Sequence, residues 1–141
     1  MAVLDRFGIR YLIVGGVAFG IYAEPRYTKD LDILVHVDPT SADRLYAALK
    51  EYGAPLNVIL PSDFLKHDFV YYFGVAPWRV DILTSIPGVD FNEAYGDRMV
   101  GDWGGYRASF ISAPARHTEA HIAQLEYIQT IYGDHDWHIG V

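Results

Sequence analysis

Short apolar runs alternate with polar and turn residues along the chain, and each run has the length of one strand or one helix. Runs rich in β-branched and aromatic residues favour strands, whereas apolar residues three or four apart favour helices. The pattern predicts strands at 11–14, 31–37, 56–60, 69–73, 78–83 and 106–111, and helices at 17–23, 42–52, 91–98 and 118–131. This mixture predicts one α/β (α+β) domain over residues 1–141.

The clearest local signal is the helix predicted at 42–52. Its apolar side chains recur at helical spacing: Leu45, Ala48, Leu49 and Tyr52. Ser41 precedes the helix as a capping residue, and Gly53 stands where a C′ glycine commonly ends one. Both ends of this helix are therefore predicted from the sequence.

Composition sets the class of protein. With 141 residues, of which 51% are hydrophobic, the chain has enough apolar material for one compact domain with a core. The absence of cysteine excludes disulfides and thiolate metal sites, so a metal would need oxygen or imidazole ligands. No run approaches the roughly 20 apolar residues that span a bilayer. Asp5 and Arg6 interrupt the apolar N-terminus, which argues against a signal peptide, and a cytoplasmic location is expected.

The formal net charge of −7 argues against a broad electrostatic grip on nucleic acid. The last lysine is Lys66, and beyond it positive charge rests on arginines alone: Arg79, Arg98, Arg107 and Arg116. An acidic protein of this kind favours a protein or a cationic small molecule as its partner over long nucleic acid.

Two aspartates lie at the start of the second predicted strand, Asp30 just before it and Asp32 within it. Asp30 and Asp32 are separated by one residue, so in a strand their side chains point to the same face. Their neighbours are apolar, and burying two carboxylates is costly unless a positive group compensates. Mg²⁺ is the natural partner for such oxygen ligands. An exposed pair at a strand edge is the alternative.

A third aspartate and a glycine pair complete the pattern. Asp81 lies inside the predicted strand 78–83, and if that strand pairs with the one at 31–37, three carboxylates converge. Such a cluster can hold one or two Mg²⁺ ions against phosphate. Gly15 and Gly16 enter the helix at 17–23, where backbone N–H groups can approach phosphate oxygens. A simple ion pair of Asp81 with Arg79, or a turn capped by Asp81, is the alternative.

Three segments carry a resemblance to a known family: 12–16, 26–33 and 79–82. In order and spacing they resemble the polymerase-β-type nucleotidyltransferase superfamily, and within it the small bacterial nucleotidyltransferases of the abortive-infection toxin type. The resemblance implies a nucleotidyltransferase-like fold, with a mixed β-sheet core and flanking helices. It also implies transfer of a nucleoside monophosphate from a nucleoside triphosphate to a hydroxyl group on RNA, a protein or a small molecule. A role in phage defence or a toxin–antitoxin pair follows from the same resemblance.

The resemblance also implies roles for individual residues. Asp30, Asp32 and Asp81 would bind Mg²⁺ or Mn²⁺, and Asp81 would also act as general base toward the acceptor hydroxyl. Nucleotide phosphates would be bound by a larger set: Gly15, Gly16, Arg26, Thr28 and Lys29.

The pattern departs from the family in residues 109–141, where relatives carry a lysine, an arginine and a further aspartate. Four groups could supply the missing positive charge: Arg26, Lys29, Arg107 and Arg116. A non-catalytic nucleotide-binding or interaction module is therefore one alternative, and a lincosamide or aminoglycoside nucleotidyltransferase is another. His117 and His121, four apart on a predicted helix, suggest zinc, but no third ligand follows from the sequence.

Overall fold

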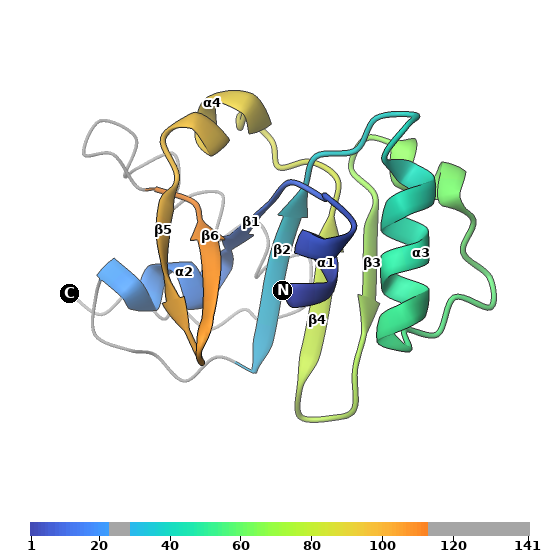
Figure 1. The fold of residues 1–141 in the computed structure, drawn as a ribbon, viewed down its shortest axis with the longest axis horizontal. Helices are drawn as coiled ribbons and strands as arrows, with labels where there is room; N and C mark the ends of the chain where they lie inside the picture. The colour runs from blue at the N-terminus through green and yellow to red at the C-terminus, as the bar shows by residue number, and fades with distance from the viewer. Residues whose placement is uncertain (23–28, 113–141) are drawn as a thin grey trace.

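The computed structural model describes residues 1–22 and 29–112, in which six strands form one mixed sheet (Figure 1). The strands are β1 (Tyr11–Val14), β2 (Asp30–Val35), β3 (Val70–Phe73), β4 (Arg79–Leu83), β5 (Met99–Trp103) and β6 (Tyr106–Phe110). Their order in the sheet is β3-β4-β2-β1-β6-β5. The pairs β2–β4 and β1–β6 are parallel, and the other three pairs are antiparallel.

Four α-helices and one 3₁₀ helix accompany the sheet in the described ranges: α1 (Ala2–Arg6), α2 (Gly15–Tyr22), α3 (Ala42–Tyr52), η1 (Pro61–Leu65) and α4 (Phe91–Gly96). The predicted mixed sheet with flanking helices is confirmed. No helix within these ranges has both the length and the apolar character needed to cross a membrane.

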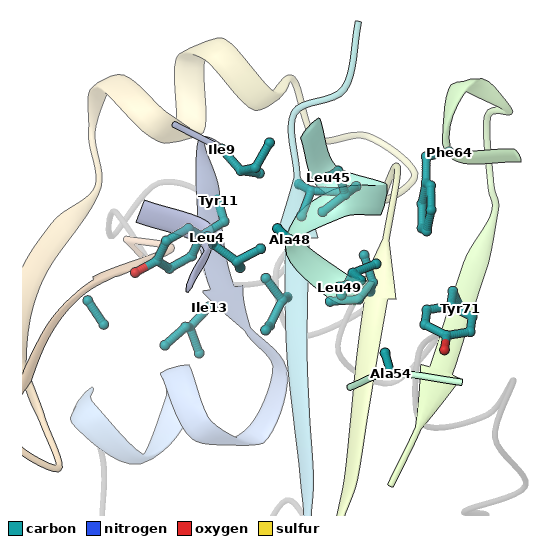
Figure 2. Close-up of a cluster of buried hydrophobic side chains, with 14 of the residues drawn as sticks. Leu4, Ile9, Tyr11, Ile13, Leu45, Ala48, Leu49, Ala54, Phe64 and Tyr71 are labelled. Atoms are coloured by element: carbon teal, nitrogen blue, oxygen red, sulfur yellow. The ribbon is translucent and has the colours of Figure 1, made fainter. Parts of the chain in front are cut away.

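The main core lies where α1 and α3 cover one face of the sheet (Figure 2). Leu4 of α1 and Leu45 of α3 are buried there with Ile13 and Ile33 of the central strands. Because side chains alternate along a strand, the neighbouring residues point to the opposite face. There Leu12, Leu34 and Leu83 form a second, smaller cluster, against which Phe91 and Ala94 of α4 pack. Both faces of the sheet therefore carry apolar packing around β2.

Helix α3 has the predicted bounds, and Gly53 ends it in a left-handed conformation with φ of 93°. Its start depends on Asp38, whose Oδ1 accepts hydrogen bonds from the backbone N–H groups of Thr40 at 2.8 Å and Ser41 at 2.9 Å. Ser41 Oγ in turn accepts a bond from the Asp38 N–H at 2.8 Å. This reciprocal pair holds the turn that leads into the helix.

The predicted strand at 56–60 is wrong. Ile59 N–H donates to the Leu56 carbonyl, which closes a turn, and η1 follows directly. Leu56 is buried, whereas Val58 is 88% exposed and Leu60 is 63% exposed. The apolar run therefore contacts the core through Leu56 and Ile59 and takes no part in the sheet.

Three elements were not predicted: α1, η1 and β5. Strand β5 forms a hairpin with β6, in which Trp103 pairs with Tyr106 across Gly104 and Gly105. Both glycines have positive φ, at 63° and 86°, as two-residue hairpin turns require. The Gly-Gly pair was the available signal. The predicted helix at 118–131 lies outside the described residues.

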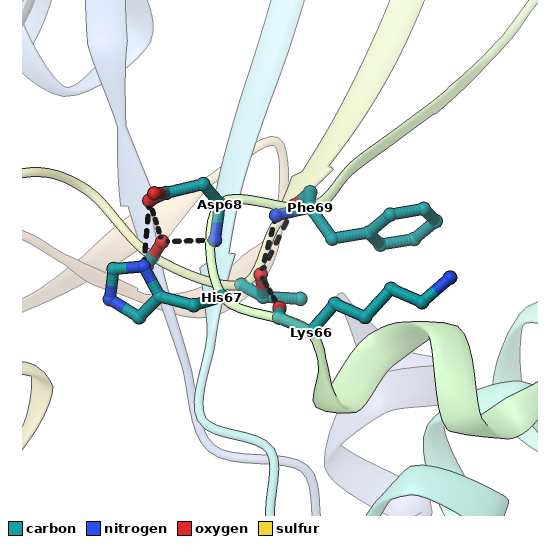
Figure 3. A network of polar contacts seen from close by, with 6 residues as sticks. Lys66, His67, Asp68 and Phe69 are labelled. Carbon is teal, nitrogen blue, oxygen red and sulfur yellow. Dashed lines mark hydrogen bonds and ion pairs between the residues drawn. The ribbon is translucent and has the colours of Figure 1, made fainter.

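Polar contacts tie the loop before β3 to the carboxyl end of β4 (Figure 3). Ser85 Oγ donates to Asp68 Oδ1 at 2.6 Å and accepts from the Asp68 N–H at 2.8 Å. Thr84 Oγ1 donates to the Lys66 carbonyl at 2.7 Å and accepts from the Phe69 N–H at 3.0 Å. These bonds hold β3 on β4 at the end of the strand opposite to Arg79.

Candidate functional site

Four charged side chains gather where β2 and β4 begin. The two strands run parallel, with Asp30 opposite Arg79 and Asp32 opposite Asp81. Residues in register on paired strands share a face, and so do residues two apart on one strand. All four side chains therefore lie on the face that carries the smaller apolar cluster. We call Asp30, Asp32 and Asp81 the acid row.

Two members of the acid row are removed from water. The exposed fraction is 6% for Asp32 and 0% for Asp81. Burial, followed by the negative charges of Asp81 and Asp30, raises the pKa of Asp32 to about 7. Burial is also the main cause that raises the pKa of Asp81 to about 6, against the lowering effect of Arg79. The site thus concentrates negative charge that the protein solvates poorly.

Arg79 bridges two members of the acid row. Its Nη2 lies 3.1 Å from Asp30 Oδ2, and its Nε lies 2.9 Å from Asp81 Oδ1. Asp81 Oδ2 is buried and accepts no hydrogen bond from the residues that the structure describes. The sequence suggested Arg79 only as an ordinary partner of Asp81, and its contact with Asp30 was missed. The spacing of two residues between Arg79 and Asp81 was the signal that they share a face.

Gly15 joins β1 to α2 against the acid row. Val14 pairs with Asp32 across the sheet, so the chain turns into α2 beside that carboxylate. Gly15 has φ of 67°, and a Cβ at this position would lie 2.1 Å from Asp32 Oδ2. Only glycine fits both the conformation and the space. Gly16 belongs to the first turn of α2, where backbone N–H groups lack partners within the helix and the helix dipole is positive.

The other predicted phosphate-binding residues are only partly described. Lys29 directly precedes β2 and is exposed, and its carbonyl accepts the Arg79 N–H at 3.1 Å. Arg107 is exposed on β6. Arg26, Thr28 and Arg116 lie outside the described residues, as do the histidines on which the zinc alternative depends.

The donor chemistry of the acid row fits a hard divalent cation. Three carboxylates supply oxygen ligands of the kind that Mg²⁺ and Mn²⁺ prefer, and the buried Asp81 Oδ2 still lacks a donor among the described residues. In the present arrangement Arg79 supplies the positive charge. Across residues 1–22 and 29–112, no three acidic or histidine side chains are gathered closely enough to hold a metal together.

Comparison with known proteins finds similarity in structure and none in sequence. No family profile and no curated protein matches the chain. Among solved structures, the chain is similar to the solution structure of the antibiotic-resistance factor ANT(2'')-Ia, with a TM-score of 0.58 and 18% identity. The match covers 96% of this chain and 71% of that one. At this identity the similarity concerns the fold alone, and it agrees with the predicted nucleotidyltransferase-like α+β fold.

Proposed function

We propose that this chain is a nucleotidyltransferase, which transfers a nucleoside monophosphate from a nucleoside triphosphate to a hydroxyl group on RNA, a protein or a small molecule. The observation that carries the proposal is the buried carboxylate pair of Asp32 and Asp81, directly opposite each other beside the start of α2. A protein loses stability by burying two such groups, and a bound cation offsets that loss. Anionic phosphate fits the positive N-terminus of the helix next to them.

In this proposal the acid row holds Mg²⁺ or Mn²⁺, which would neutralise charge on the triphosphate. Gly15 and Gly16 present backbone N–H groups to phosphate oxygens, and the segment before β2 adds Arg26, Thr28 and Lys29. Asp81 accepts the proton of the acceptor hydroxyl as a general base. The deprotonated oxygen then bonds to the α-phosphorus, and the bond from that phosphorus to the departing pyrophosphate breaks.

One observation favours a small-molecule acceptor. The chain shares its fold with an antibiotic-resistance factor, over 96% of its own length. The net charge of −7 also suits a cationic acceptor such as an aminoglycoside. A toxin-type enzyme that modifies tRNA or a partner protein is the other form of the same proposal, and a non-catalytic nucleotide-binding module is the alternative to it.

Isothermal titration of each nucleoside triphosphate, with and without Mg²⁺, tests the site. We expect Mg²⁺-dependent binding by the wild type and a loss of at least about 100-fold in affinity for Asp32→Asn, because an amide cannot replace a charged ligand. Asp38→Asn is the matched control, since Asp38 lies after the far end of β2, and it should bind like the wild type. Absence of binding by every nucleotide would contradict the proposal.

Transfer is tested separately with labelled nucleotides. The protein, Mg²⁺ and each labelled triphosphate are incubated with aminoglycosides, lincosamides, tRNA or cell protein, and the labelled species is identified. Label on one of these classes identifies the acceptor. Binding without transfer to any of them would favour the non-catalytic module.

A further inference from the structure

We infer that Arg79 is the resident cation of the acid row, which divalent metal must displace from Asp30 and Asp81 before it can bind there. The inference rests on the proposed function, because it concerns the same metal site. It adds a residue that the family resemblance does not assign. It also explains how the site holds its charge before a ligand arrives.

The geometry makes Arg79 a substitute for a metal ion. One guanidinium contacts two carboxylates that come from different strands, at 3.1 Å and 2.9 Å. A cation shared by those oxygens would need the same space and would meet the same two charges. Metal and guanidinium therefore compete for Asp30 and Asp81.

Arg79 is also the positive group that the pKa values of Asp32 and Asp81 depend on. It lowers the pKa of both Asp32 and Asp81, against the burial and carboxylate repulsion that raise them. Arg98, by contrast, lies with its guanidinium 3.9 Å from the ring centre of Tyr95 and donates to the Tyr95 carbonyl. That arginine is held elsewhere and cannot replace Arg79.

Displacement couples metal binding to nucleotide binding. A metal ion that arrives alone must break both contacts of Arg79 and leaves the guanidinium without those partners. A metal ion that arrives with a triphosphate brings phosphate oxygens that the released guanidinium can contact. Each ligand therefore strengthens binding of the other, and the coupling is reciprocal.

The test is titration of Mn²⁺ into the wild type and Arg79→Met, each with and without a non-hydrolysable nucleoside triphosphate analogue. Without the analogue, we expect Arg79→Met to bind Mn²⁺ about tenfold more tightly, because its carboxylates have lost their competitor. The increase in Mn²⁺ affinity that the analogue produces should fall by about the same factor. Arg79→Lys should lie between the two, since one ammonium cannot bridge both carboxylates as a guanidinium does.

Arg44→Met is the matched control, because Arg44 lies on α3 and contacts the Phe7 carbonyl at 3.5 Å, away from the acid row. Its Mn²⁺ affinity should equal that of the wild type. Thermal unfolding in EDTA checks folding: Arg79→Met should melt below the wild type, and Mn²⁺ should raise its midpoint more. If it does not fold, Arg79→Lys carries the comparison.

The outcomes separate the inference from the proposed function. Unchanged Mn²⁺ affinity in Arg79→Met and Arg79→Lys, with normal nucleotide binding, would overturn the inference and leave the function standing. Tighter Mn²⁺ binding in Arg79→Met, with no nucleotide bound by any variant, would support the inference and overturn the function. A purely structural ion pair would lower the melting midpoint without changing metal affinity.

Discussion

The two ends of β2 carry aspartates in opposite surroundings. Past its carboxyl end, Asp38 accepts bonds from Thr40 and Ser41, and these bonds lower the pKa of its carboxyl to about 2. Near its amino end, six residues earlier, Asp32 is buried beside other carboxylates and its pKa is raised to about 7. The same residue type thus titrates in two different ranges within one short segment.

The parallel partner β4 repeats the contrast. At its carboxyl end, Ser85 and His67 both contact the carboxylate of Asp68 and lower its pKa. At its amino end, Asp81 is fully buried and one of its oxygens accepts no hydrogen bond from the described part of the chain. Because β2 and β4 run parallel, Asp38 and Asp68 both lie near the carboxyl ends of these strands. The acid row lies near their amino ends.

The difference separates structural carboxylates from carboxylates available to a ligand. Asp38 and Asp68 are surrounded by donors from nearby turns, so the protein itself stabilises their charge. Asp32 and Asp81 lie inside strands whose backbone N–H groups serve the sheet, so their charge depends on Arg79 or on a bound cation. Folding alone does not require aspartate at those two positions.

The largest expected effect comes from Gly15→Ala, which forces a methyl group against Asp32. Gly104→Ala is the matched control, because Gly104 has nearly the same φ, 63° against 67°, and no atom within 4 Å of an added Cβ. We expect a loss of about 3 kcal/mol or more in the free energy of unfolding for Gly15→Ala, and about 1 kcal/mol for Gly104→Ala. Urea unfolding measures both.

Adding Asp32→Ala to Gly15→Ala should recover part of the loss, because it removes the carboxylate oxygen in closest approach. Equal losses for the two glycine variants would mean that the positive φ alone, and not the close approach of Gly15 to Asp32, makes alanine unfavourable at this position.

The second prediction concerns pH in the absence of divalent metal. The folded protein holds the Asp32 proton up to a pKa of about 7, whereas the reference value is 3.8, so folding favours the protonated form. This contribution to stability is fully present below about pH 4 and is lost as the pH rises through about 7, by an amount on the order of 3 kcal/mol. Urea midpoints measured in EDTA between these values should fall for the wild type.

Asp32→Asn should reduce that fall to the part that Asp81 contributes, because the amide does not titrate, and it should exceed the wild type in stability at the upper end. Divalent metal should also flatten it by binding the charged form. If the urea midpoint of Asp32→Asn fell with pH as steeply as that of the wild type, the titrating group would be a residue other than Asp32.

The local elements were predicted well because they depend on neighbouring residues. Helix α3 has its own spacing and stop signal, and the alternating faces of β2 follow from a period of two. The failures involve distant partners. Leu56 to Leu60 has a strand-like composition but no strand to pair with, whereas β5 contains Gly101 and Asp102 and is stabilised by its hairpin with β6.

The candidate site divides in the same way. Asp30 and Asp32 could be assigned to one face from spacing alone. Arg79 bridges Asp30 to Asp81 because it lies opposite Asp30 in the sheet. This position depends on the register between two strands whose paired residues are 49 positions apart in the chain. No local pattern in the sequence encodes that register, so the contact of Arg79 with Asp30 was missed, although its pairing with Asp81 had been considered.

The smallest expected effect comes from Asp38, where the charge itself matters little. Asp38→Ala removes the acceptor for Thr40 and Ser41 and should lower the urea midpoint modestly, whereas Asp38→Asn keeps an oxygen in place and should stay close to the wild type. Neither should alter binding of Mg²⁺ and nucleotide. At Asp32 the same exchange of carboxylate for amide should raise stability in EDTA at neutral pH and weaken binding by at least about 100-fold. If Asp38→Asn lost nucleotide binding, the distinction between the two ends of β2 would be wrong. The carboxylate of Asp38, which accepts hydrogen bonds from its own turn, would then also be needed for the ligand.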